Sequence, residues 1–257
     1  MTDETLDHAY SPSRFTCDVE ATLARQAVAG RELAARQPPL ELVDGDDSAA
    51  RLDLFVPESM PRSEGPRPLM AFIHGGYWQE LDHTATDFLA EGLLARGMAF
   101  ASLGYGLAPA TSIEAMVGQC ARGLEMAIAA LDEHGGAGPV ILGGHSAGAQ
   151  LACRVAAAGG VRIDGLLLVS GVYDLTPLVD TYVNAPLGLD RARARSLSPR
   201  FGDLSTLPPA RVVIAEHDPP ALRHQGCDFV AALCAADREA ALVDLPGCDH
   251  FDILEHL

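Results

Sequence analysis

The sequence has no long apolar run and no apolar leader. No segment approaches the ~20 consecutive apolar residues that a helix needs to span a bilayer. The first residues, Met1 to Asp7, lack both the basic start and the apolar core of a secretory signal. We therefore expect a cytoplasmic protein that does not enter a membrane.

Metal-binding cysteine motifs are also missing. The cysteines form no C-x-x-C pair and no Cys/His cluster at zinc spacing. We therefore expect no metal and no other cofactor, and free thiols in a reducing cytoplasm. Cys248 is notable because it lies two residues before a histidine discussed below. The six cysteines are Cys17, Cys120, Cys153, Cys227, Cys234 and Cys248.

Basic residues are scarce. The chain has 18 Lys and Arg against 35 Asp and Glu, which gives a formal net charge of -17. Nucleic acids and anionic membranes both reward clustered basic side chains, so this balance argues against either partner. The acidity is typical of a soluble protein. We expect a small-molecule partner and leave the oligomeric state open, with a homodimer as one option.

The order of the predicted elements indicates a single α/β domain over residues 1–257. A length of 257 residues allows a sizeable core. An Ala/Glu/Arg-rich segment predicts a helix over 18–37, within an N-terminal arm over 1–39. A hairpin over 40–43 and 51–56 follows. The polar, Pro-rich and Arg-rich segment 174–207 is the best candidate for a small cap.

Strand and helix patterns alternate after the hairpin. Such alternation predicts a mostly parallel, doubly wound sheet with helices on both faces, and an active site beyond the carboxyl ends of the strands. The predicted strands are 69–73, 98–103, 140–142, 165–170, 211–215 and 241–245. The predicted helices are 84–96, 112–134, 147–158 and 220–236.

The most informative motif is Gly144-His145-Ser146-Ala147-Gly148, which fits G-x-S-x-G between a predicted strand and a predicted helix. A serine on so sharp a turn presents its hydroxyl away from both elements. A hydroxyl is a poor nucleophile until a base removes its proton and a third group orients that base. Ser146 is therefore a candidate nucleophile that needs a histidine and a carboxylate.

Both partners follow later strands. His250 lies just after the last predicted strand, and Asp218 follows the strand before it. The chain order Ser146, Asp218, His250 is that of the α/β-hydrolase triad. Glu216 competes with Asp218 as the acid, and Asp249 is adjacent to the histidine, so its side chain should point elsewhere. The weaker candidates for the base are His217, His224 and His256.

A glycine-rich loop supplies candidate donors for an oxyanion. His74-Gly75-Gly76-Tyr77-Trp78 directly follows the strand over 69–73. Two successive glycines let backbone N–H groups turn toward a pocket. Each such donor contributes about 10²- to 10³-fold in rate. The N–H of Ala147, which follows the nucleophile at a helix start, is expected to contribute as well.

With these motifs in place, the chain resembles the α/β-hydrolase superfamily and, within it, the kynurenine formamidase (arylformamidase) branch. Residues 74–79 look like the HGGxW motif of that branch, and residues 144–149 look like its GHSAGA elbow. Gln150 stands where many relatives carry histidine. Similar segments are Tyr10–Ser13, Tyr105–Pro109, Ser170–Leu175, Glu216–Pro219 and His250–Asp252.

The resemblance implies a metal-independent serine hydrolase that cleaves the formamide of an N-formyl arylamine, with N-formyl-L-kynurenine as the implied substrate. It implies that the N–H groups of Gly76 and Tyr77 form the oxyanion hole. Trp78 and Tyr77 could wall the aromatic substrate, although Trp78 could equally pack under the cap. The alternatives are a carboxylesterase for short acyl or aryl esters, and a biosynthetic acyltransferase or cyclase with the same triad.

The amino-acid end of such a substrate has no obvious partner in the sequence. Four arginines in the cap segment could pair with its carboxylate, but a solvated cap face is the favoured interpretation. They are Arg191, Arg193, Arg195 and Arg200.

Overall fold

The structure is a computed structural model that describes residues 4–45, 47–57 and 66–257. Residues 1–3 of the predicted arm, and residue 46 between the two strands of the predicted hairpin, lie outside the described residues. Eight strands form one sheet in the order β1-β2-β4-β3-β5-β6-β7-β8. They are β1 Leu40–Asp44, β2 Asp47–Phe55, β3 Arg67–Ile73, β4 Ala99–Leu103, β5 Ala137–His145, β6 Gly165–Val169, β7 Ala210–Ala215 and β8 Ala240–Leu245.

The sheet is parallel except at one edge. β1 pairs antiparallel with β2, and β2 pairs antiparallel with β4, whereas all other neighbours run parallel. The predicted hairpin and the predicted mostly parallel sheet are therefore confirmed. β5 is longer than the predicted strand over 140–142, because Gly143 and Gly144 continue its pairing with β3 and β6.

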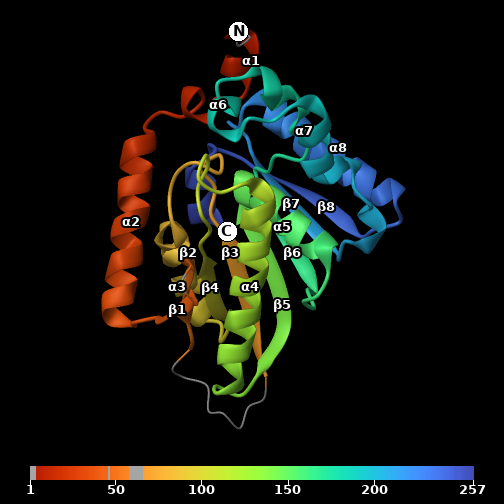
Figure 1. Cartoon of the computed structure of the whole chain (residues 1–257). Coiled ribbons are helices and arrows are strands. Elements are labelled where there is room, and N and C mark those ends of the chain that lie inside the picture. Colours follow the sequence, from red (N-terminus) through yellow and green to blue (C-terminus); the bar gives the residue numbers. More distant parts are fainter. Residues whose placement is uncertain (1–3, 46, 58–65) are drawn as a thin grey trace.

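Helices cover both faces of the sheet, as the sequence predicts (Figure 1). The α-helices are α1 Glu4–Ala9, α2 Val19–Arg36, α3 Ala90–Leu94, α4 Ile113–Asp132, α5 Ala147–Ala158, α6 Asn184–Leu187, α7 Arg191–Leu197 and α8 Pro220–Ala235. Short 3₁₀ helices cover Pro12–Arg14, His83–Leu89, Thr176–Asp180, Pro199–Phe201, Leu204–Thr206 and Asp252–His256.

The alternation of side chains along β3 divides the core into two layers. Leu69, Ala71 and Ile73 pack in the layer that α4, α5 and α8 cover. Met70 and Phe72 pack in the opposite layer, with residues of α2, α3 and the C-terminal 3₁₀ helix. Because successive side chains of a strand point to opposite faces, an apolar run without polar interruptions fills both layers at once.

Two predicted segments, the helix 84–96 and the cap 174–207, have a more detailed structure than their sequences indicate. The segment 84–96 begins as the 3₁₀ helix His83–Leu89 and becomes α-helical only in α3. The Asp82 side chain caps the start of that 3₁₀ helix, and Thr86 shares a 3.0 Å hydrogen bond with Ser102 of β4. The second segment, 174–207, holds α6, α7 and short 3₁₀ helices. Figure 1 places α6 and α7 with α1 at one end of the molecule.

In the part of the chain that the structure describes, helices lack the combined length and hydrophobicity required to cross a bilayer.

The approach of α5 to β3 gives a first test. A Cβ at Gly148 would lie 2.1 Å from the carbonyl oxygen of Ile73, so no side chain fits there. We expect Gly148→Ala to lower the free energy of unfolding by about 3 kcal/mol or more, since neither backbone can yield easily. Gly118→Ala in α4 is the control, because its Cβ would meet only the Arg122 side chain at 3.4 Å. Equal urea midpoints for the two variants would contradict this interpretation.

Candidate active site

Ser146 lies on the sharp turn between β5 and α5. Its φ of 54° and ψ of -116° are unusual for a residue with a side chain. The turn is possible because a Cβ at Gly144 would come within 2.3 Å of the Gly148 carbonyl oxygen, and glycine has none. The two glycines of the motif are therefore a steric requirement of the turn that presents Ser146.

Asp218 and His250 meet beyond the ends of β7 and β8. The Nδ1 of His250 donates to the Oδ1 of Asp218 at 2.6 Å. The other carboxylate oxygen accepts from the Ser170 hydroxyl at 2.5 Å and from the Ala215 N–H at 2.8 Å. Burial opposes ionisation of Asp218, but these hydrogen bonds outweigh it and hold its pKa below the ordinary value.

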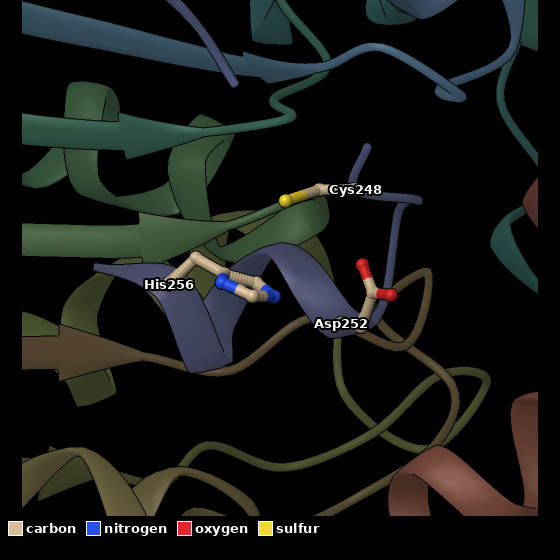
Figure 2. A group of neighbouring side chains, drawn as sticks. All are labelled: Cys248, Asp252 and His256. Atoms are coloured by element: carbon tan, nitrogen blue, oxygen red, sulfur yellow. The ribbon is translucent and has the colours of Figure 1, made fainter. Parts of the chain in front are cut away.

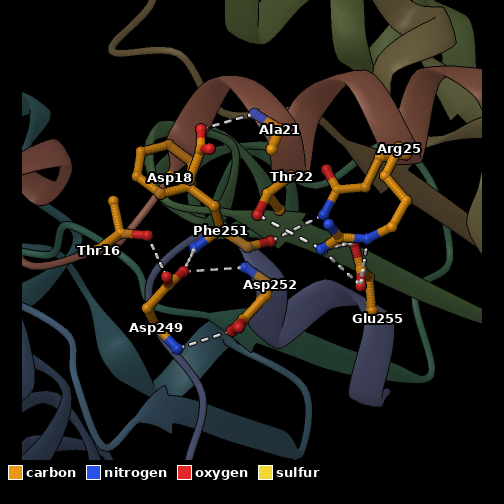
Figure 3. Close-up of polar contacts among 10 residues, drawn as sticks. Thr16, Asp18, Ala21, Thr22, Arg25, Asp249, Phe251, Asp252 and Glu255 are labelled. Atoms are coloured by element: carbon orange, nitrogen blue, oxygen red, sulfur yellow. Dashed lines mark hydrogen bonds and ion pairs between the residues drawn. The ribbon is translucent and has the colours of Figure 1, made fainter.

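The competing acids have other partners. Glu216 accepts the Gly247 N–H at 2.8 Å. Asp249 accepts the N–H groups of Phe251 at 2.8 Å and of Asp252 at 3.1 Å, together with the Thr16 hydroxyl, as Figure 3 shows. Asp249 thus stabilises the turn that carries His250, and its side chain points away from the imidazole, as the sequence predicts.

The N-terminal arm holds the loop of His250 from outside (Figure 3). The Gln26 side chain of α2 donates to the Phe251 carbonyl oxygen at 2.9 Å. Arg25, one residue earlier, pairs with Glu255 at 3.0 Å. A helix at the start of the chain therefore positions a loop near its end.

His145 supports the same loop from the core. Its Nε2 donates to the His250 carbonyl oxygen at 2.8 Å, and the two rings lie 4.7 Å apart between centroids. Burial, followed by the charge of His250, lowers the pKa of His145 to about 3. His145 is therefore neutral at physiological pH and adds no positive charge beside the second imidazole.

The loop after β3 has a backbone that few residues adopt. Gly76, Tyr77 and Trp78 have φ values of 89°, 48° and 61°. The Tyr105 hydroxyl anchors the loop, because it lies 2.9 Å from the Gly75 carbonyl oxygen and 3.1 Å from that of His74. Among the described residues, the N–H groups of Gly76 and Tyr77 donate to no other protein atom. They are free to donate to a ligand.

Trp78 lies in the core and not on the cavity beside Ser146. It is fully buried, and its Nε1 donates to the Gln150 side chain at 3.1 Å. Gln150 in turn donates to the Leu197 carbonyl oxygen in α7 at 2.9 Å. Trp78 therefore packs beneath the segment 174–207 and does not form a wall for the substrate. Gln150 links the loop after β3 to the segment 174–207.

A cavity of about 270 Å³ lies at Ser146 and His250. Tyr77, Gly75 and Gly76 line it from the loop after β3. The same loop adds His74, Gln79, Glu80 and Leu81, and the elbow adds His145. Other lining residues come from α2 and the residues before it, from the 3₁₀ helix after Asp82, from Tyr182 and Val183 in the segment 174–207, and from Phe251 and Leu254. The predicted nucleophile, base and first two oxyanion donors thus share one cavity, and Ala147 begins α5 directly behind it.

The cap arginines lie away from this cavity. Arg191 pairs with Asp180, Arg193 with Glu114 and Arg200 with Asp228. The Arg195 guanidinium lies 3.9 Å from the centroid of the Phe201 ring. These contacts agree with the favoured interpretation of a solvated cap face.

One group of side chains has the donor types of a metal site. The ligand atoms of Cys248, Asp252 and His256 all lie within 4.8 Å of one another (Figure 2). Cys248 lies on the loop before His250, and the other two lie on the 3₁₀ helix after it. Cys248 is buried and His256 is exposed. None of the three lines the cavity at Ser146, so a metal there would not reach a reacting bond.

Sequence reasoning missed three supporting residues. Ser170 follows β6 with a φ of 47°, and its role emerges only when the ends of β6 and β7 are adjacent. His145 lies inside the elbow motif and Tyr105 inside the segment Tyr105–Pro109 that resembles the family. The sequence marks both residues but assigns neither a role. The strained φ of Ser170 has no sequence signal.

Comparison with known proteins identifies the family of this fold. A family model described as alpha/beta hydrolase fold matches residues 70–253. The chain therefore belongs to the α/β-hydrolase fold family.

Sequence relatives point to a narrower group within this fold family. The kynurenine formamidase of Danio rerio is 32% identical, with 100% of this chain and 92% of the relative aligned. That of Salmo salar is 30% identical with the same coverage. The crystal structure of a thioesterase candidate from Silicibacter sp. tm1040 superposes with a TM-score of 0.83 at 28% identity, over 97% of this chain and 93% of the other. The resemblance to kynurenine formamidases and the hydrolase class are confirmed.

The two neutral buried imidazoles predict a pH dependence of stability. Burial lowers the pKa of His74 to about 4, and that of His145 is about 3. An unfolded histidine titrates near pH 6.5, so below that pH the unfolded chain binds the extra protons and each histidine favours unfolding. Between pH 7 and pH 5 each contributes a loss of about 2 kcal/mol.

The measurement compares variants, because Asp87 acts in the opposite direction. Burial and the nearby Asp53 raise the pKa of Asp87 to about 8. For each protein, the free energy of unfolding in urea is measured at pH 7 and at pH 5. We expect the loss of stability between these two pH values to be about 2 kcal/mol smaller in His74→Asn than in the wild type, and likewise in His145→Gln. The exposed His224→Asn is the control, and a change equal to that of the control would refute the assignment.

Proposed function

We propose that the protein hydrolyses the formamide of an N-formyl arylamine, converting N-formyl-L-kynurenine to L-kynurenine and formate. The observation that carries the proposal is the His250–Asp218 pair at 2.6 Å, beside a serine on a strained turn in one cavity. Full-length similarity to kynurenine formamidases supports the choice of substrate. The six free cysteines support a cytoplasmic location. The segment 174–207 serves as a small cap.

The first half of the reaction forms an acyl-enzyme. Ser146 Oγ attacks the formyl carbon while His250 Nε2 accepts the hydroxyl proton. Asp218 holds the ring by its Nδ1–H, so the imidazolium that forms is stabilised in place. The tetrahedral oxyanion accepts hydrogen bonds from the N–H groups of Gly76, Tyr77 and Ala147. Collapse breaks the C–N bond, and His250 returns the proton to the departing aryl amine.

The second half regenerates the enzyme. A water molecule gives a proton to His250 and attacks the formyl ester on Ser146. Collapse breaks the bond to Ser146 Oγ, His250 returns the proton to that oxygen, and formic acid leaves as formate after giving its proton to solvent. An aryl amine leaves more readily than an alkyl amine, so a site with esterase-like groups is sufficient for this amide. Every step uses side chains and backbone of this chain, and none requires a metal.

A carboxylesterase is the second candidate. The structural likeness to the thioesterase candidate at a TM-score of 0.83 favours it, because an ester or thioester would use the same nucleophile and oxyanion donors.

Replacing the nucleophile tests the proposal directly. We expect Ser146→Ala to lower kcat for formate release from N-formylkynurenine by at least about 10⁴-fold, since the acyl-enzyme cannot form. The exposed Ser196→Ala is the matched control and should retain full activity. Activity of the wild type should survive a chelator. Near-normal turnover by Ser146→Ala would show that the nucleophile is wrong.

The base is tested by a pair of histidine variants. His250→Ala should abolish turnover, whereas the exposed His256→Ala should not. The opposite result would assign the base to His256. No formate release by the wild type together with rapid cleavage of nitrophenyl acetate would favour the esterase.

Ser170 is expected to be a positioning residue. Its hydroxyl donates to the same carboxylate that orients His250. A hydrogen bond to a charged group contributes about 1.5–3 kcal/mol, so we expect Ser170→Ala to lower kcat at least about tenfold. KM should stay within about twofold, because Ser170 does not line the cavity. An unchanged kcat, or equal changes in KM and kcat, would contradict this role.

A further inference from the structure

Among the described residues, the lining of the cavity at Ser146 holds one carboxylate, that of Glu80, and several acceptor oxygens, but no arginine or lysine. We propose that this cavity binds the protonated amine of its substrate and provides no cationic partner for a carboxylate. The inference rests on the proposed function and defines its substrate class more narrowly: aryl formamides with an aliphatic ammonium group. The groups that carry it are Glu80, Gln26, Gln79, His74 and Tyr77.

Two glutamine side chains of the lining keep an acceptor oxygen that engages no hydrogen-bond donor among the described residues. Gln26 Nε2 donates to the Phe251 carbonyl oxygen at 2.9 Å, and Gln79 Nε2 donates to the Val183 carbonyl oxygen at 2.9 Å. An amide whose nitrogen is engaged by the protein retains its Oε1 as an acceptor. Both residues line the cavity, and each can offer a ligand its Oε1 as an acceptor.

Two deeper groups have the same polarity. His74 Nδ1 donates to the Gly75 carbonyl oxygen at 3.0 Å, and its buried Nε2 has no partner among the described residues. With one ring nitrogen donating, the neutral ring presents the other as an acceptor. The Tyr77 hydroxyl donates its proton to the Tyr10 carbonyl oxygen at 2.8 Å and keeps its lone pairs.

The charges around the cavity are of one sign. Glu80 is the one carboxylic side chain among the lining residues that the structure describes, and it is exposed at the surface. The sequence has no lysine, and no arginine appears in that lining. The cap arginines that could have reached a carboxylate are engaged elsewhere.

This arrangement discriminates between the two ends of an amino acid. A carboxylate that enters the cavity gives up water and meets oxygen acceptors, which is unfavourable for a negative charge. An ammonium group has three donors and no acceptor, so it matches the same lining. The carboxylate of a zwitterionic substrate is therefore expected to stay at the solvent-exposed side.

Three probes test the inference: N-formylkynurenine, its analogue without the carboxylate, and its analogue without the amine. Release of formate gives kcat and KM for each. We expect kcat/KM of the decarboxylated probe to equal or exceed that of N-formylkynurenine. We expect kcat/KM of the deaminated probe to be at least about tenfold lower, mainly through KM. A deaminated probe that is hydrolysed as well as the decarboxylated one would overturn the inference.

A charge variant adds a second, independent readout. Glu80→Gln should raise KM for the two amine-bearing probes several-fold, with kcat and the deaminated probe unaffected. Glu239→Gln is the matched control, because it removes the same charge from an exposed position outside the cavity. Equal KM values in the two variants would contradict the role of Glu80.

Failure of the proposed function can be told apart from failure of this inference. If the wild type cleaves none of the three formamides but cleaves phenyl acetate, the proposed function is wrong. The inference is then tested with aryl esters that carry either an aminoalkyl or a carboxyalkyl chain. A preference for the aminoalkyl ester supports it, and equal rates or the reverse preference overturn it.

Discussion

A buried carboxylate organises the catalytic end of this molecule. Asp218 is almost fully buried, and an ionised carboxylate in such surroundings is tolerated only when donors satisfy its oxygens. The donors come from the end of β6 through Ser170, from β7 through Ala215, and from the loop after β8 through His250. Adjacent positions of these three strands in the sheet bring the donors together. The strand order is thus a requirement of the site as much as of the core.

The loop of His250 is held by contacts distant in sequence. α2 contacts it through Gln26 and Arg25, and the elbow contacts it through His145. The first and last parts of the chain therefore close over the same imidazole. Since the cavity is lined by that helix as well as by the loop, the arm both positions His250, the proposed base, and shapes the cavity beside it.

Local patterns predicted most of the fold. The alternation of apolar runs and helical patterns can be recognised in the sequence without knowledge of tertiary contacts. The sheet and the long helices could therefore be placed from the sequence. The G-x-S-x-G elbow and the acid and histidine after successive strands also have local signals. Ser170 and Trp78 do not: the role of the first depends on which strands are neighbours, and the burial of the second on a backbone with φ of 61° that turns its ring toward Gln150. The 3₁₀ start at His83 depends on capping by Asp82.

The neutral imidazoles and the cavity lining have one property in common: neither supplies a fixed positive charge. Burial keeps His74 and His145 unprotonated, so neither supplies the positive charge that an anionic substrate would need. The proposed reaction creates one cation, on His250, and Asp218 lies 2.6 Å from it as the counter-charge. A further fixed cation near His250 would disfavour protonation of the base. Keeping arginine out of the lining therefore serves the acid–base step, and an affinity for ammonium-bearing substrates follows from the same restriction.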